Sequence, residues 1–247
     1  MAKVAAQLII YGKRTQTDIA GVIREIGRAG YDGIEAGNVT TAVPPEHLRN
    51  LLAVNGMELA GLHTGYNGLD QADQMVGYLS KLSGHHLMVS GVGDIKRGLV
   101  AYQEAANTFN KIGERVKTVG ISHCYPHHSW EFQKFGGKPA IEVLLESTDP
   151  RFVFACFDTY WVRHGGHDPA KFIDKWLPRL AFVHLKDIRK DGKFAEIGQG
   201  ILDWKSIFAV LKKADLPWYC VEQDQTEQDP EESLRISREF LRDNFSI

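Results

Sequence analysis

Cysteine, long apolar runs and an excess of either charge are what this sequence lacks. Its 247 residues include three cysteines, and 29 basic side chains stand against 31 acidic ones, for a net charge of -2. The odd cysteine count, with Cys124, Cys156 and Cys220 each inside an apolar stretch, predicts buried thiols in a reducing compartment. The balanced charge, with no basic patch, argues against a nucleic-acid partner or a membrane surface.

No apolar run is long enough to cross a membrane, and the opening "MAKVAAQLII" is too short for a secretory signal. The composition, 43% hydrophobic and 24% charged, is that of an ordinary globular protein. We therefore expect a cytoplasmic protein whose partner is a small molecule. The composition leaves homo-oligomerisation open.

Short β-rich runs alternate with longer helical patterns along the chain. Residues 17–30, 45–56 and 203–216 carry apolar side chains at three- and four-residue spacing, and 229–243 opens with Asp-Pro and acidic residues, which is typical of a helix start. The predicted strands are residues 4–10, 32–37, 58–64, 85–91, 119–125, 152–158, 180–187 and 218–224.

Eight alternating strand–helix units over this length predict an α/β fold, a closed (β/α)8 TIM barrel formed by residues 1–247 as a single domain. The competing architecture is an open doubly wound sheet. Its usual marker is a glycine-rich turn after the first strand, but "IIYGKRTQTD" contains a single glycine. No change of composition indicates a linker or a second domain.

Polar residues gather where the predicted strands end, at the face on which TIM barrels carry their active sites. Side-chain alternation directs His184, Lys186, Glu222 and Asp224 toward the barrel mouth and Asp187 to the other face. The other strand-end residues are Glu35, His63, His127, His128, Glu131 and Asp158. Several strands can therefore converge on one substrate.

The fifth strand leaves regular geometry at Pro126, so alternation does not choose between His128 and Glu131, and we expect His127 or His128 to be structural. Asp158, His184, Glu222 and one strand-five residue would form a metal site. With a carboxylate from strand five, three oxygens and one nitrogen make a hard site. We expect one divalent ion, Mn²⁺ or Mg²⁺, with Co²⁺ or Zn²⁺ as alternatives.

Three further residues at the mouth are candidates for substrate binding, Glu35, His63 and Trp161. His63 and Trp161 follow the same ends of their strands as Asp158 does, so we expect them to line one pocket. Trp161 and its neighbour Tyr160 either pack or form a wall on which a sugar ring stacks.

The motifs "YPHHSWEF", "FDTYWV", "VHLKD", "IGQGILDW" and "VEQD" resemble, in order and spacing, the sugar isomerase/epimerase family with the xylose isomerase-like barrel. The resemblance covers about residues 30–242. It implies one divalent metal held by Glu, Asp, His and Glu at the ends of strands five to eight. Those positions correspond here to Glu131, Asp158, His184 and Glu222. A common subgroup reads Tyr-His-Asn-His at strand five, whereas this chain has Pro126 and His127 at the two middle positions.

The same fold hosts a three-metal DNA-repair family, endonuclease IV, which carries a His three residues after the strand-six Asp. Trp161 takes that position here, and no Asp-x-His follows strand seven within residues 185–203. We therefore expect a single metal and no DNA substrate.

The resemblance implies chemistry on a keto-sugar or sugar derivative, in which a metal acts as Lewis acid for a carbonyl and stabilises the enediolate left by proton abstraction. Glu131 and Glu222 are the candidate bases, with His128 and Lys186 as proton donors or oxygen clamps. Returning the proton would make the protein an isomerase or epimerase. Loss of a β-substituent, from a keto-sugar, a 3-keto-glycoside or an inosose, would make it a lyase or dehydratase. A non-catalytic sugar-binding barrel is the alternative from another class.

Overall fold

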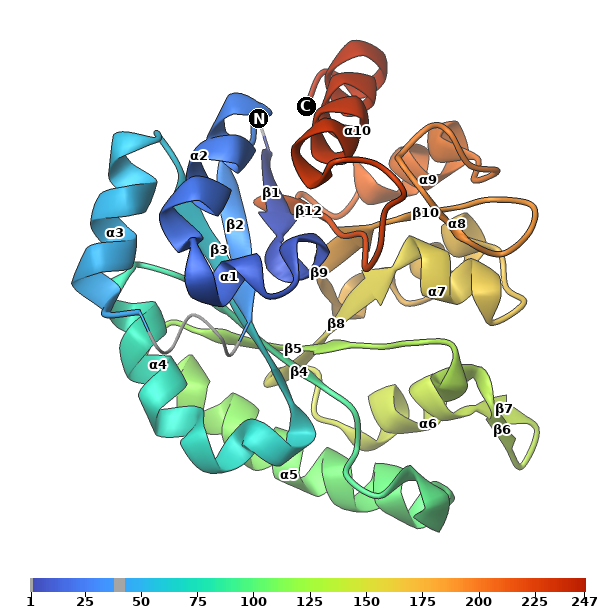
Figure 1. The fold of residues 1–247 in the computed structure, drawn as a ribbon. Helices are drawn as coiled ribbons and strands as arrows, with labels where there is room; N and C mark the ends of the chain where they lie inside the picture. The colour runs from blue at the N-terminus through green and yellow to red at the C-terminus, as the bar shows by residue number, and fades with distance from the viewer. Residues whose placement is uncertain (1, 38–42) are drawn as a thin grey trace.

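Eight parallel strands close into one barrel in the computed structural model, which describes residues 2–37 and 43–247 (Figure 1). The order around the barrel is β1-β12-β9-β8-β5-β4-β3-β2, so β12 closes it between β1 and β9. The prediction of a single-domain TIM barrel is confirmed. The strands are β1 (Lys3–Gln7), β2 (Gly33–Gly37), β3 (Glu58–Gly65), β4 (His86–Ser90), β5 (Ser122–Pro126), β8 (Val153–Asp158), β9 (Leu180–Leu185) and β12 (Trp218–Val221).

Helices surround the barrel, as Figure 1 shows. Aspartates begin five of those in the described part of the chain, because a backbone N–H of the first turn donates to the side chain of each capping residue: Asp18, Asp158, Asp168, Asp203 and Asp229. The helices are α1 (Arg14–Thr17), α2 (Ile19–Arg28), α3 (Pro45–Val54), α4 (Ala72–Lys81), α5 (Leu99–Lys117), α6 (Ala140–Ser147), α7 (Thr159–His164), α8 (Pro169–Lys175), α9 (Trp204–Leu211) and α10 (Pro230–Phe245). Short 3₁₀ turns are η1 (Leu8–Tyr11), η3 (Tyr66–Gln71), η4 (Ile95–Arg97), η5 (Trp130–Phe132) and η6 (Leu177–Arg179).

Two helices from opposite ends of the chain meet beside the closing strand. Arg28 of α2 pairs with Glu231 of α10 at 2.7 Å, and the Tyr31 hydroxyl donates to the Leu234 carbonyl at 2.9 Å. These contacts join the first and last β/α units, so the barrel is closed by helices as well as by strands. Among the described residues, none of the helices combines the length and the apolar character that a membrane span requires.

The predicted strands are all present, but three of them end two or three residues earlier than expected. The first ends at Gln7, whose side chain accepts from the Ile9 N–H and starts η1. The strands β9 and β12 end at Leu185 and Val221. Lys186 and Glu222 consequently come directly after the last residues of their strands, where side chains can turn into the mouth.

Small and sulfur-containing side chains fill the barrel interior below the mouth. All three cysteines are free and buried, as predicted, and belong to this interior cluster. Gly33 is required beside Trp218, because a Cβ there would lie 2.8 Å from the indole ring. The interior cluster comprises Ala5, Ala60, Met88, Cys124, Cys156, Phe182, Trp218 and Cys220. The barrel is therefore a packed core, and a ligand has room only above it.

Two short hairpins extend the strand-to-helix connections, β6 (Lys134–Phe135) with β7 (Lys138–Pro139) and β10 (Asp187–Ile188) with β11 (Phe194–Ala195). The second follows β9 and is anchored by the buried carboxylate of Asp187. The Trp204 indole donates to this carboxylate at 2.7 Å and the Ile188 N–H at 2.8 Å. The remaining donors are the backbone N–H groups of Gly198, Gly200 and Leu202. Asp187 thus holds the motif "IGQGILDW" against the barrel.

Candidate active site

The strand register brings the predicted ligands to one place. Asp158 pairs with His184 across β8 and β9, and Cys220 pairs with His184 across β9 and β12. Glu222, two residues beyond Cys220, is therefore level with Lys186, one layer above His184. Asp158, His184, Lys186, Glu222 and Asp224 are called the mouth cluster below.

His184 lies between two carboxylates. Its Nε2 is 2.7 Å from Oε2 of Glu35, and its Nδ1 is 2.7 Å from Oε2 of Glu222. Burial acts to lower the pKa of His184, but Cys156, Glu222 and Glu35 together raise it well above its ordinary value. Burial likewise acts to raise the pKa of Glu222, yet His184 and Lys186 hold it well below the usual range.

Lys186 is a fully buried cation with three acidic neighbours. Its Nζ lies 2.5 Å from Oδ2 of Asp224, 3.0 Å from Oε1 of Glu222 and 3.7 Å from Oδ2 of Asp158. Burial opposes the charged form, but Glu222, Asp158 and Asp224 outweigh it and raise the pKa of Lys186. The ammonium group is therefore retained in a site from which water is largely excluded.

Aromatic rings cover Lys186 on its other side. Its Nζ is 5.0 Å from the ring centroid of Phe194, 5.1 Å from that of Trp161 and 5.7 Å from that of Tyr160. Such contacts stabilise a cation against ring faces. These three rings, called the aromatic wall below, close the mouth on this side.

The two carboxylate oxygens of Asp158 differ in their contacts. Oδ1 accepts from the Trp161 N–H at 2.9 Å and caps α7. Oδ2 is buried and accepts no hydrogen bond. Burial raises the pKa of Asp158 to about 7, although Lys186 acts in the opposite direction. The capping role alone would leave the second oxygen unexplained.

The donor atoms of the mouth cluster fit a divalent metal. One ligand atom each from Asp158, His184 and Glu222 lie within 4.8 Å of one another. Oε2 of Glu222 faces Nδ1 of His184 at 2.7 Å. A buried Asp158 oxygen without a hydrogen bond, beside an imidazole nitrogen and a second carboxylate, is an arrangement that one shared cation would satisfy. The set of two oxygens and one nitrogen suits Mn²⁺, Mg²⁺, Co²⁺ or Zn²⁺.

The strand-five carboxylate has hydrogen-bond partners of its own. Glu131 is buried, and its two oxygens accept from the Tyr125 hydroxyl at 2.7 Å and from the His128 N–H at 2.9 Å. Burial raises the pKa of Glu131. The group whose ligand atoms lie within 4.8 Å of one another comprises Asp158, His184 and Glu222, and a ligand role for Glu131 stays a prediction.

The two neighbouring histidines differ in role. His127 donates from Nδ1 to the His128 carbonyl at 3.2 Å and accepts from the Asp158 N–H at Nε2, also at 3.2 Å. Burial lowers the pKa of His127 to about 3, so its imidazole is neutral and links the end of β5 to β8 through the Asp158 N–H. His128 stacks on Trp130 with centroids 4.0 Å apart, and its Nδ1 is buried with no hydrogen-bond partner. Burial lowers the pKa of His128 to about 4.

The predicted substrate residues fall into two layers. Trp161 belongs to the aromatic wall, and its ring is 5.5 Å from that of His128. His63 lies 6.3 Å from His184 between ring centroids, and its Nδ1 is 3.1 Å from Oε1 of Glu35. Glu35 has no exposed surface. The structure places Glu35 beneath the mouth and Trp161 at its rim.

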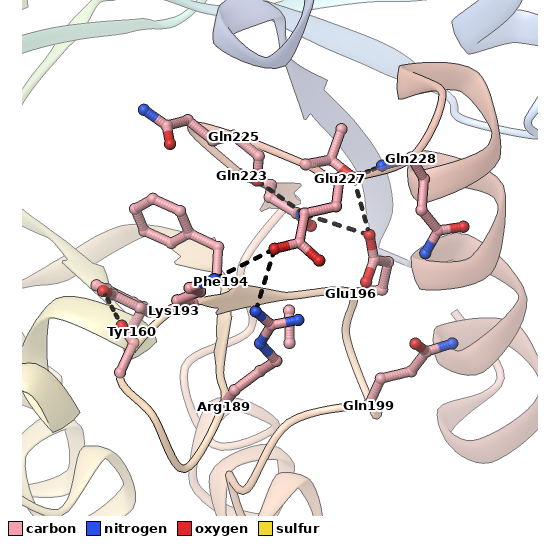
Figure 2. A pocket seen from close by; sticks show the side chains of 13 residues that line it. Tyr160, Arg189, Lys193, Phe194, Glu196, Gln199, Gln223, Gln225, Glu227 and Gln228 are labelled. Atoms are coloured by element: carbon pink, nitrogen blue, oxygen red, sulfur yellow. Dashed lines mark hydrogen bonds and ion pairs between the residues drawn. The ribbon is translucent and has the colours of Figure 1, made fainter.

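A cavity of about 460 Å³ opens on the far side of Phe194, between the β10–β11 hairpin and the segment after β12 (Figure 2). Tyr160 and Phe194 line it as well as the aromatic wall. Arg189 and Lys193 both pair with Glu227 across it. Its other side chains are mostly carboxamides, those of Gln199, Gln223, Gln225 and Gln228. The carboxylate of Glu196 also lines the cavity and accepts from Gln223 and Thr226, so hydrogen-bonding groups dominate the surface that faces a ligand.

Sequence reasoning missed two participants of this site. Phe194 belongs to β11, a two-residue strand with no recognisable pattern, so nothing in the sequence indicated that it covers Lys186. Asp224 was directed to the mouth by alternation but not assigned a role, and it forms the shortest contact of Lys186. The signal for Asp224 was therefore present in the strand parity.

A model of the family described as xylose isomerase-like TIM barrel matches residues 23–244. An inosose dehydratase of Bacillus thuringiensis (strain Al Hakam) is 26% identical over 267 residues, which cover 91% of this chain and 89% of the relative. A sugar phosphate isomerase/epimerase from Parabacteroides distasonis superposes with a TM-score of 0.84 at 19% identity, covering 99% of this chain and 95% of that one. The IolI protein, with a bound zinc atom, superposes with a TM-score of 0.75 at 12% identity, covering 98% and 97%.

Proposed function

The chain belongs to the xylose isomerase-like TIM-barrel family, and from this premise we propose that it is a divalent-metal-dependent enzyme that removes the proton beside the carbonyl of a keto-sugar or inosose. The observation that carries this proposal is the group of Asp158, His184 and Glu222, in which one ligand atom of each residue lies within 4.8 Å of the others and Oδ2 of Asp158 is buried without a hydrogen bond. A cation bound there supplies Lewis acidity for the substrate carbonyl and its neighbouring hydroxyl.

Glu222 acts as the base. Its Oε1 contacts Lys186 and its Oε2 faces His184, and it comes directly after β12 at the rim of the site. The neighbouring cations weaken its basicity, so proton removal depends on a substrate whose α-proton is acidified by its polarised carbonyl. Lys186, with its ammonium group 3.0 Å from Glu222, holds the developing negative charge on the substrate oxygen and provides a proton to a departing hydroxyl.

We assign water elimination as the outcome of proton removal. Return of the proton to the opposite face calls for a second base, and the candidate for that role was Glu131. Both Glu131 oxygens are engaged by Tyr125 and by the His128 backbone. One base and one acid on the same side fit loss of a β-hydroxyl: the C–H and C–O bonds break, a C=C bond forms and water leaves. The similarity to inosose dehydratases over 91% of the chain supports this outcome.

The surroundings suit a polyhydroxylated substrate. The aromatic wall offers ring faces to the C–H groups of a sugar, and carboxamides both donate and accept hydrogen bonds. We assign the cavity of Figure 2, with its four glutamines, to substrate hydroxyls remote from the carbonyl. Phe194 lines both this cavity and the side of Lys186, which links the cavity to the mouth cluster.

The test is turnover of scyllo-inosose and of open-chain keto-sugars in D₂O, with Mn²⁺ supplied to chelator-treated protein. We expect deuterium exchange at the α-carbon and an unsaturated, dehydrated product, both dependent on the ion. Exchange with an epimeric or isomeric product would instead establish the isomerase or epimerase. Absence of exchange with every ketose and inosose, despite sugar binding, would support the non-catalytic barrel and overturn the proposal.

A further inference from the structure

Glu35 is a buried carboxylate whose two oxygens are both committed to imidazoles. Oε2 lies 2.7 Å from Nε2 of His184, and Oε1 lies 3.1 Å from Nδ1 of His63. A carboxylate held between two imidazoles accepts from both, so Nε2 of His184 donates in this contact.

His184 belongs to two groups of residues that could hold an ion. One adds Asp158 and Glu222, and the other adds Glu35 and Cys220. Glu35 lies on the Nε2 side of the ring and Glu222 on the Nδ1 side. A neutral imidazole offers a lone pair on one nitrogen only, so the two groups exclude each other.

The Nε2 side is already satisfied by hydrogen bonds. Glu35 accepts there, and the Sγ of Cys220 lies 3.8 Å from the Val221 carbonyl as a weak donor. Oδ2 of Asp158, which is buried without a hydrogen bond, belongs to the other group.

We propose that Glu35 is a positioning residue for the metal: it fixes the proton of His184 on Nε2 and turns the Nδ1 lone pair toward Asp158 and Glu222. The proposal rests on the metal dependence of the proposed function, but not on which sugar is turned over. A carboxylate behind a ligating imidazole also makes the ring a stronger donor.

His63 holds Glu35 in place. Its Nε2 lies 3.1 Å from the Ser90 hydroxyl, so β3 and β4 support the carboxylate of β2 through one imidazole. The chain of contacts runs from Ser90 through His63 and Glu35 to His184. Because both Glu35 oxygens are used in this chain, Glu35 acts through His184 and not by contact with substrate, in contrast to the sequence-based expectation.

The experiment measures metal affinity, so its readout is independent of turnover. Chelator-treated wild type and variants are titrated with Mn²⁺ by calorimetry and with Co²⁺ by visible absorption. Glu35→Gln keeps the size of the side chain and removes its charge. We expect it to weaken binding by roughly 10- to 100-fold and to alter the Co²⁺ spectrum. Glu35→Asp, which keeps the charge, should recover part of this loss, and Cys220→Ser should bind within about threefold of wild type.

Thermal unfolding of each metal-free variant separates this role from a structural one, and Glu35→Asp serves if Glu35→Gln does not fold. Wild-type affinity in Glu35→Gln would overturn the proposal. Loss of binding in Cys220→Ser as large as in Asp158→Asn would also overturn it, because the ion would then lie on the Nε2 side. Metal binding without turnover of any sugar would defeat the proposed function and leave the role of Glu35 intact, whereas a wild type that binds no ion would defeat both.

Discussion

Lys186 and Asp187 are neighbours in the sequence, yet their side chains belong to two buried polar regions that differ in how completely their oxygens are hydrogen-bonded. Asp187 accepts from five donors of the β9–α9 connection, and both of its oxygens are satisfied. On the other face, Lys186 meets three carboxylates, and Oδ2 of Asp158 is buried there without a hydrogen bond. The oxygens of Asp187 are satisfied by donors within the chain, whereas the carboxylates around Lys186 include an oxygen that is not.

This difference distinguishes a polar region that stabilises the fold from one that serves a function. A buried polar group without a partner costs about 1–3 kcal/mol, and more when it is charged. The Asp187 network stabilises the fold, whereas the mouth cluster lowers stability until something else satisfies its oxygens. Substitutions in the two regions should therefore have opposite consequences.

The largest effect is expected from Asp158→Asn. The amide oxygen can still cap α7, but the charge that a cation needs is lost. Turnover of the substrate should fall about 10³-fold or more, equivalent to about 4 kcal/mol. The melting temperature of the metal-free protein should stay the same or rise, since a buried charge is removed. A large fall in melting temperature would place Asp158 with Asp187, as a structural residue.

Glu222→Gln should have the next largest effect. It preserves one ligand oxygen and removes the base, so kcat should fall by about 10² while some metal stays bound. Steady-state kinetics with and without excess Mn²⁺ check this. Restoration of the rate by Mn²⁺ would make Glu222 a ligand only, and normal turnover with normal metal affinity would remove it from the site.

Asp187→Asn should do the reverse of Asp158→Asn. Loss of the charge weakens several hydrogen bonds, and the free energy of unfolding should fall by about 1.5–3 kcal/mol. Metal affinity of the folded protein should remain within about threefold of wild type, because Asp187 does not contact the mouth cluster. Denaturant unfolding and Mn²⁺ titration measure the two quantities. Asp203→Ala, which removes only the cap of α9, is the control and should cost about 1 kcal/mol.

Substitution of His123 should have the smallest effect. It also tests most directly whether a buried polar group without a partner indicates function. Both of its ring nitrogens are buried without partners, but it packs against Phe109 of α5, on the outside of the barrel. His123→Phe should stabilise the protein by about 1 kcal/mol at neutral pH without changing turnover. Loss of activity would mean that His123 has a function and that the mouth is not the only working region.

The same substitution has a pH signature. Burial lowers the pKa of His123 from 6.5 to about 3, so between these values the unfolded chain binds a proton that the folded protein does not. Stability therefore falls as the pH drops through this window, by up to about 1.4 kcal/mol per pH unit. Unfolding of His123→Phe should depend less on pH from 6.5 downward. Equal slopes for the two proteins would contradict the assignment.

The sequence predicted the barrel because apolar periodicity and strand spacing repeat through the whole chain, and local patterns of this kind survive in the fold. Strand parity also directed His184, Lys186 and Glu222 to one mouth, where the structure has them. Pro126 marked the point at which this logic ends. Beyond it, the positions of His128 and Glu131 depend on Tyr125 and Trp130, contacts that no periodicity encodes.

The same limit applies to residues that act across the barrel. Glu35 was expected to contact substrate because it ends a strand. Its actual partners, His63 and His184, follow from barrel closure and from side-chain rotamers. Asp187 was correctly placed away from the mouth by parity, but its five donors lie in a connection with hardly any regular structure.

Closure of the barrel by β12 also sets when the site can exist during synthesis. Glu35 and His184 are separated by 149 positions, and Glu222 comes directly after β12, which follows the other barrel strands in the sequence. Contacts between such distant segments are slow to form. A nascent or truncated chain ending before residue 218 would carry Asp158 and His184 without their last ligand. Metal capture should consequently follow completion of the fold, which protects the growing polypeptide from binding ions in a half-built site.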